Sequence, residues 1–304
     1  MRRVKITLPA TATNIGPGIH TLGLALGLYT TVEITERTDE SLVVETEGEG
    51  AGRYGTGLQH PVVLALIRVF QRLERAPLGL TVKIANQIPL GSGLGAETAF
   101  LVAGIIGANN LLGNTLSRAD VLEMTAQISR RPDHTVTAIL GGLTASMVDA
   151  GALVYRTFPV SAPRMVVVLP QLENFPGEDR TTLPERVSFE DVIYNLSRIP
   201  LLIEAFGSGN LEQFGRLMND KLLTPLLRPH ISGYDQVADI ARRAGAQAIT
   251  VSGNGPAMIA FATTGHKKLA EAMEAAFENA GVKARSWILQ VDTQGVVVSI
   301  AQSA

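Results

Sequence analysis

The chain has 304 residues, 46% of them apolar, which is enough for two domains that each bury a core. Its 26 basic and 28 acidic side chains give a formal net charge of -2, which excludes a general attraction to nucleic acid or to an anionic membrane. It contains no cysteine, which excludes disulfide bonds, thiolate metal sites and a cysteine nucleophile and is compatible with a cytoplasmic location. Catalysis would therefore use oxygen and nitrogen groups.

The first half of the chain is predicted to contain strands and helices in alternation. Alternating β-branched residues predict strands at 2–8, 30–46, 78–84, 140–148 and 154–158. Helical spacing of apolar residues predicts helices at 61–73, 96–113 and 118–128, and glycines predict a turn region at 48–57. The longest apolar stretch, 100–112, is about half of the roughly 20 residues that cross a bilayer, so it is interpreted as a buried helix.

A change of composition near residues 159–163 predicts a domain boundary, which gives domains at 1–157 and 158–304. In the second domain, the patterns predict helices at 189–206, 211–222, 234–244 and 267–280 and strands from about 165 and at 248–251, 257–263 and 284–290. Strands flanked by helices in so small a unit indicate an α+β fold with an antiparallel sheet.

The segment IPLGSGLGAET joins a predicted strand to the long buried helix. Its glycines permit tight turns that direct successive N–H groups into one concavity, and a helix N-terminus adds partial positive charge. The segment therefore predicts a phosphate site, although a plain strand-to-helix turn is the structural alternative. The residues of this predicted site are Gly91, Ser92, Gly93, Leu94, Gly95, Ala96, Glu97 and Thr98.

This glycine segment and two others, PATATNIGPGIHTLGLAL and TVSGNGPAMIAF, resemble the three ordered motifs of the GHMP small-molecule kinases. RPDHTVTAILGGLTAS, DRTTLPERV to YNLSR, and DKLLTPLLRPHISGYD resemble signatures of the homoserine kinases within that superfamily. The resemblance covers nearly the whole chain. It implies an N-terminal domain like ribosomal protein S5 domain 2, a ferredoxin-like C-terminal domain, and transfer of the γ-phosphoryl group of Mg-ATP to the hydroxyl of homoserine or a relative.

The same resemblance implies four substrate-binding residues. Arg180 and Arg228 would grip the substrate carboxylate, which a guanidinium fits well. Asn14 would bond the substrate or fix its own loop. His20 stands where the family has an aspartate, and histidine does not supply the negative charge that pairs with an ammonium. A substrate with a carboxylate and no adjacent ammonium is therefore an alternative to homoserine.

The resemblance also exposes departures around the metal. Ala96 and Glu97 replace a pair of family serines, and Ser129 replaces the family's acidic metal ligand. In one hypothesis Glu97 takes over the contact with magnesium. In another it fills the phosphate site, so that no ATP binds. In the structural alternative it only stabilises the start of its own helix.

The last positions carried over concern the reaction and the support of the loop. Asp133 and His134 stand where the family has an Asp-Asn pair, and His134 is expected in a loop. A neutral His134 would accept the proton of the substrate hydroxyl. Asp133 would orient the imidazole ring of His134 or act as the base itself. Gly253 and Gly255 would support the phosphate loop.

The leading prediction is a cytoplasmic, homoserine-kinase-like phosphotransferase of threonine biosynthesis. Its cofactors would be ATP and magnesium. Its partner would be a small-molecule substrate, and neither nucleic acid nor a membrane is expected as a partner. A homodimer is the expected assembly because two-fold dimers are the commonest oligomers. One alternative is a GHMP-like binding or regulatory protein without catalysis. Another is an enzyme of the same fold with metal-independent chemistry, in which Glu97 and His134 form an acid/base pair.

Overall fold

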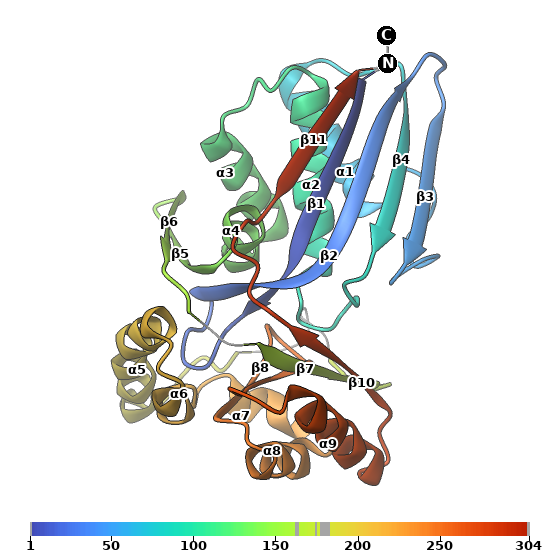
Figure 1. The fold of residues 1–304 in the computed structure, drawn as a ribbon. Coiled ribbons are helices and arrows are strands. Elements are labelled where there is room, and N and C mark those ends of the chain that lie inside the picture. The colour runs from blue at the N-terminus through green and yellow to red at the C-terminus, as the bar shows by residue number, and fades with distance from the viewer. Residues whose placement is uncertain (1, 162–163, 174, 177–182, 303–304) are drawn as a thin grey trace.

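The computed structural model describes residues 2–161, 164–173, 175–176 and 183–302. In these residues the strands form two sheets, and Figure 1 shows them one above the other with helices packed against each. This is the α+β class that the sequence predicts. Within the described residues, no helix combines the length and the apolar character needed to cross a bilayer.

The first sheet has seven strands, in the order β11-β1-β2-β4-β3, with β5 paired to β2 and β6 paired to β5. Its strands are β1 (Arg2–Thr13), β2 (Leu22–Arg37), β3 (Leu42–Gly48), β4 (Gly79–Asn86), β5 (Leu143–Asp149), β6 (Ala152–Phe158) and β11 (Val297–Gln302). The helices of this half are α1 (Pro61–Leu73), α2 (Ala96–Leu111), α3 (Arg118–Ser129) and α4 (Pro132–Leu140).

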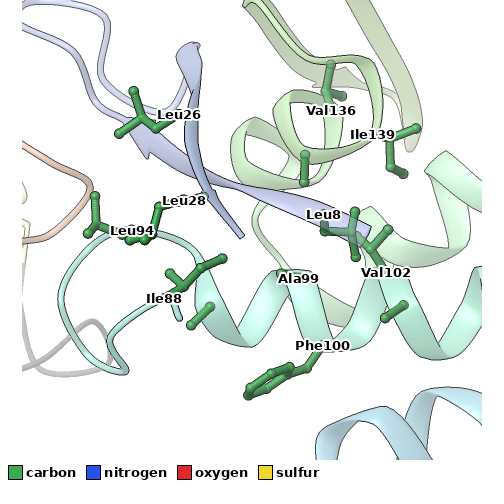
Figure 2. Packing of buried hydrophobic residues seen from close by; sticks show 14 of the residues in the cluster. Leu8, Leu26, Leu28, Ile88, Leu94, Ala99, Phe100, Val102, Val136 and Ile139 are labelled. Atoms are coloured by element: carbon green, nitrogen blue, oxygen red, sulfur yellow. The ribbon is translucent and has the colours of Figure 1, made fainter. Parts of the chain in front are cut away.

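Helix α2 is the centre of the first core. It is buried along nearly its whole length and packs against α1, to which Gly104 allows a close approach, since a Cβ there would lie 2.4 Å from the Val62 carbonyl oxygen. Figure 2 shows Phe100 and Val102 of α2 in one cluster with Leu8 of β1 and Ile139 of α4. The start of α2 is therefore held rigidly against the sheet.

The last strand of the chain lies in the first sheet. β11 pairs antiparallel with β1, from Arg2 opposite Gln302 to Thr7 opposite Val297, and Figure 1 shows the red strand beside the dark blue one. The sequence predicts no element after residue 290, so this return is visible only in the structure. The first sheet thus includes residues from outside the predicted domain 1–157.

The second sheet has four antiparallel strands in the order β10-β7-β9-β8. Its strands are β7 (Met165–Pro170), β8 (Ala248–Val251), β9 (Met258–Phe261) and β10 (Ala284–Leu289). The helices of this half are α5 (Phe189–Ser208), α6 (Leu211–Leu217), α7 (Thr224–Leu227), the short 3-10 helix η2 (Arg228–His230), α8 (Tyr234–Arg243) and α9 (His266–Asn279).

Strand β7 is buried on both faces. Met165 and Val167 join the large cluster that continues from the first sheet, whereas Val166 and Val168 pack in a second cluster with α8 and α9. Successive side chains of a strand point to opposite faces, so one apolar run serves both cores. The large cluster crosses from one sheet to the other without interruption, and the two halves are packed together.

Three sequence expectations need correction here. The strand expected at 30–46 is divided, because β2 ends at Arg37 and β3 begins at Leu42. Residues 132–140 form α4, whereas a loop was expected around His134. Proline in the first turn favours a helix at this position. The β-branched residues of the segment have a low helix propensity, so the sequence gives no clear helical signal. The helix expected at 211–222 ends at Leu217, because the Asp220 carboxylate accepts the N–H groups of Leu222, Leu223 and Thr224 in a separate turn.

Candidate active site

The glycine loop between β4 and α2 leads directly into the first turn of α2, and residues 91–97 are called the cradle below. Gly91, Gly93 and Gly95 have φ values of 64°, 82° and 76°, which side chains rarely adopt. The first N–H bonded within α2 is that of Ala99, to the Gly95 carbonyl at 3.0 Å, so the N–H groups before it have no partner within the helix. Such a turn at a helix N-terminus matches the requirements of a phosphate group.

The segment 250–261 is bonded to the cradle from the other half of the molecule. Ser252 donates its hydroxyl to the Gly93 carbonyl at 2.8 Å, and Ala257 donates its N–H to the Ser92 carbonyl at 3.0 Å. A Cβ at Gly253 would lie 2.8 Å from the Gly93 oxygen. These contacts join two of the three sequence motifs.

The first motif joins them through the end of β1 and the loop after it. The buried Asn14 has a φ of 55° and donates from Nδ2 to the Gly253 carbonyl and to Asn254 Oδ1, both at 3.0 Å, while its Oδ1 accepts from the His20 N–H at 2.8 Å. This is the loop-fixing role that the sequence allowed for Asn14. The side chain of His20 is exposed beyond that contact.

His134 lies buried beneath the cradle. Its Nδ1 is 2.6 Å from Thr11 Oγ1, its Nε2 is 3.0 Å from Thr13 Oγ1, and a Cβ at Gly95 would lie 2.8 Å from Nδ1. Only 1% of the residue is exposed. Both ring nitrogens therefore bond to β1, and the Thr11 hydroxyl and the ring together fill the space that Gly95 leaves open.

Asp133 is fully buried and forms a two-point contact with Arg131. The guanidinium donates from Nε to Oδ1 and from Nη2 to Oδ2, both at 3.3 Å, and Nη2 also donates to Thr13 Oγ1 at 3.2 Å. Arg131, Thr13 and His134 thus form one hydrogen-bonded chain, which ends at Thr11 and the glycine loop.

Burial and charge set the ionisation of this chain. Burial lowers the pKa of His134 to about 3, and the positive charge of Arg131 acts in the same direction, so the ring is neutral. Burial alone would raise the pKa of the Asp133 carboxyl, but the interactions with His134 and Arg131 outweigh it and hold that pKa at about 2. At neutral pH the pair is a carboxylate beside a neutral imidazole.

Glu97 does not fill the cradle. Its side chain is exposed in the first turn of α2, and its Oε1 accepts the Tyr54 hydroxyl at 2.6 Å. The start of α2 has no side-chain cap, so the capping role considered from the sequence is not the one observed. The polar groups of the cradle fit a polyphosphate, and a carboxylate at its rim fits magnesium, which takes one or two carboxylates besides phosphate oxygens and water.

The position of the family's metal ligand is occupied by a hydrogen-bonded serine. Ser129 Oγ accepts from the Arg131 N–H at 3.1 Å and lies 3.1 Å from Thr135 Oγ1. Within the described parts of the chain, no three or more acidic, histidine or cysteine side chains form a group that could hold a metal ion.

Arg228, one of the two predicted carboxylate-binding arginines, does not join this cluster. Arg228 is exposed on η2, where Nη2 donates to Asp235 Oδ2 at 2.6 Å and the guanidinium lies 5.9 Å from the Tyr234 ring centroid. It lines a surface pocket of about 460 Å³ beside α8. Arg180 lies outside the residues that the structure describes.

The sequence analysis missed Thr11, Thr13 and Tyr54. The two threonines alternate with alanines in ATATN, so they share one face of β1, and both are buried. The alternation of hydroxyl residues just before Asn14 is the sequence feature from which Thr11 and Thr13 could have been recognised as part of the site. Tyr54 is the aromatic residue of the glycine-rich turn, and nothing local links it to Glu97.

Comparison with known proteins agrees with the three-motif geometry. The family model of the GHMP kinases N terminal domain matches residues 62–142, and that of the GHMP kinases C terminal matches residues 202–281. The chain is 37% identical to the homoserine kinase of Moorella thermoacetica over 294 residues, which cover 96% of this chain and 99% of that protein. The homoserine kinase of Carboxydothermus hydrogenoformans is 33% identical, with 97% of this chain and 96% of that protein covered.

Solved structures show the same fold. The homoserine kinase of Cytophaga hutchinsonii superposes with a TM-score of 0.86 at 25% identity, covering 98% of this chain and 97% of that one. The galactokinase of Lactococcus lactis superposes at 0.71 with 16% identity over 97% and 95% of the two chains, which shows the fold alone. With matches to both halves and full-length relatives of this similarity, the chain belongs to the GHMP kinase family and is a homoserine-kinase-like phosphotransferase.

Proposed function

We propose that the protein transfers the γ-phosphoryl group of ATP to the hydroxyl of homoserine or of a related small alcohol that bears a carboxylate. The observation that carries this proposal is the amide cradle at the start of α2, which Glu97 leaves open because its carboxylate bonds Tyr54. The similarity to homoserine kinases over nearly the whole chain supports the choice of substrate class.

The residues of the cradle would act by position and charge. Phosphoryl transfer passes through a loose transition state, so catalysis consists mainly of holding the phosphates and neutralising them. The amides of the cradle other than that of Leu94, which donates to Ser92 Oγ, would bind the phosphate oxygens together with the positive end of α2. Magnesium, when bound with ATP, neutralises the phosphates, and Glu97 would hold it from the rim of the cradle.

The acceptor hydroxyl would be oriented by the buried polar chain. With substrate bound, one Asp133 oxygen would exchange its contact with Arg131 for the hydrogen bond of that hydroxyl and receive its proton late, because little charge develops on the nucleophile in a loose transition state. Its low pKa, about 2, suits this orienting role more than early proton removal. His134, bonded at both nitrogens, would keep Thr13 and the loop in place.

The test combines nucleotide binding with turnover. Calorimetric titration of the full chain with Mg-ATP is followed by an ADP-release assay with L-homoserine and with hydroxy acids that lack the amino group. Turnover with homoserine supports the proposal, and turnover only with the hydroxy acids assigns the altered specificity to the loop of His20. Asp133→Asn should lose most of the turnover while it retains ATP binding.

No ATP binding at millimolar concentration would reject the kinase. ATP binding without turnover on any of these alcohols would instead favour a binding or regulatory protein that retains the fold.

A further inference from the structure

The contact between Tyr54 and Glu97 joins two segments that are far apart in the sequence. Tyr54 belongs to the turn region between β3 and α1, and Glu97 belongs to the first turn of α2. The phenol donates to Glu97 Oε1 at 2.6 Å. This hydrogen bond decides where the one carboxylate in the first turn of α2 lies.

Tyr54 is itself held by aromatic neighbours. Its ring makes edge contacts with His60 and Phe100 at centroid distances of 5.4 and 6.1 Å. His60 is buried and caps α1 by accepting the Val62 N–H at its Nδ1, so it is fixed in turn. The phenol therefore meets Glu97 from a fixed position.

The turn region around Tyr54 is also attached at its other end. Glu49 forms an ion pair with Arg285 of β10, and a Cβ at Gly50 would lie 2.4 Å from a methyl group of Leu90, in the glycine loop. The segment from Glu49 to Tyr54 thus borders the cradle and is tied to both halves of the molecule. Burial raises the pKa of the Tyr54 phenol, and the Glu97 carboxylate raises it further, so the hydroxyl stays protonated as a donor.

Without this donor, the carboxylate would compete with phosphate. The unpaired N–H groups and the positive end of α2 attract any nearby anion, and a carboxylate in the first turn is within their reach. A carboxylate bonded to those amides would occupy donors that a polyphosphate needs and would repel it.

We propose that Tyr54 is a positioning residue that holds the Glu97 carboxylate at the rim and so keeps the cradle open to polyphosphate. The proposal rests on the proposed function only in taking the cradle as the phosphate site. It concerns Tyr54, which acts through Glu97 and does not touch the reacting atoms.

The test is a double-mutant cycle on anion binding. Wild type, Tyr54→Phe, Glu97→Gln and the double variant are titrated with inorganic tripolyphosphate, in a chelating buffer without divalent metal and at low ionic strength. Tyr54→Phe should weaken binding about fivefold, the size expected for one charge at a helix N-terminus. In the Glu97→Gln background the same substitution should change binding less than about twofold, because the neutral amide repels no phosphate.

Tyr155→Phe, on β6, is the matched control and should leave tripolyphosphate binding unchanged. An equal loss from Tyr54→Phe in both backgrounds, or no loss in either, would overturn the proposal, as would a wild type that does not bind tripolyphosphate. Coupling between the two residues in a protein that transfers no phosphoryl group would sustain this inference and refute the proposed function, so the two failures are distinguishable.

Discussion

At the scale of single residues, the site depends on polar side chains that are buried and fully engaged. His134 bridges the hydroxyls of Thr11 and Thr13, and Arg131 bridges Thr13 and Asp133. A buried polar group that loses its partner costs about 1–3 kcal/mol. These residues therefore stabilise the fold as well as the geometry beneath the glycine loop.

Replacing His134 should lower stability substantially. His134→Ala leaves two buried hydroxyls without the imidazole and opens a cavity, so the free energy of unfolding should fall by about 2–4 kcal/mol in urea denaturation. His230→Ala is the matched control, since His230 is exposed on η2 and should change stability by less than about 0.5 kcal/mol. Similar losses in both variants would contradict the structural role of the chain.

The buried histidines also make stability depend on pH. Burial lowers the pKa of His134 to about 3 and that of His60 to about 4, against roughly 6.5 in the unfolded chain. Between these values the unfolded chain binds more protons, so the stability is fully present above about pH 6.5 and is lost as the pH falls toward 4. Asp133 also lowers the stability as the pH falls, but only below the pKa of its carboxyl in the unfolded chain, about 3.9.

His134→Asn, which introduces the family's residue, should reduce this slope by up to about 1.4 kcal/mol per pH unit. Urea denaturation at pH 7.5, 6.5, 5.5 and 4.5 measures it. An unchanged slope would mean that the pKa of His134 is the same in the folded protein as in the unfolded chain.

Glu97 provides a separate prediction about the metal. If its carboxylate holds magnesium, Glu97→Gln should raise the Mg²⁺ concentration for half-maximal turnover by about tenfold, the size of a lost charged contact. The KM for the alcohol serves as the internal control and should not change. A variant with wild-type magnesium dependence would remove Glu97 from the metal site.

At the scale of elements, the glycine loop is held between β1 and the segment 250–261. A Cβ at Gly93 would lie 2.0 Å from the Ser252 carbonyl oxygen, and the position has a positive φ of 82°. Gly91 has a φ of 64° but faces open space. The two glycines share a backbone conformation and differ in what surrounds them.

Gly93→Ala should therefore displace the loop and reduce affinity for Mg-ATP by at least about tenfold, because backbone on both sides has to move. Gly91→Ala carries only the backbone strain of roughly 1 kcal/mol and should bind nearly normally. Calorimetric titration measures both, and equal losses would show that strain, and not the contact with Ser252, is the constraint.

At the scale of the whole molecule, the two sheets depend on each other. The large apolar cluster passes through both, the segment 250–261 bonds to the glycine loop, and β11 returns to pair with β1 after the second sheet is complete. The cradle at the start of α2 is therefore built from both halves, and neither half contains all of its contacts.

Removal of residues 297–304 should uncover the edge of β1 and destabilise the whole chain. The variant loses the ladder with β1 together with the packing of Val298, so its Tm should fall by at least about 5 °C. Ile300→Ser is the control, because Ile300 is 49% exposed and its strand is retained. Thermal unfolding followed by circular dichroism measures the effect, and an unchanged Tm would show that β11 is dispensable.

The sequence by itself determined the fold class, most of the elements and the place of the glycine loop before the long buried helix. The reason is that alternation, helical spacing and the glycines of GSGLG are local properties of the chain. For Asn14 it left two roles open, bonding the substrate or fixing its own loop, and the second role rests on a local signal, a turn residue before a glycine.

Only the tertiary structure decided where Glu97 points, that His134 is a buried helical residue bonded to Thr11 and Thr13, and that Arg228 pairs with Asp235. It also decided that β11 returns to the first sheet. Each of the contacts of Glu97, His134 and β11 joins residues at least 43 positions apart. A contact between residues so far apart in the sequence is set by the packing of whole elements. The pattern of neighbouring residues contains no information about that packing.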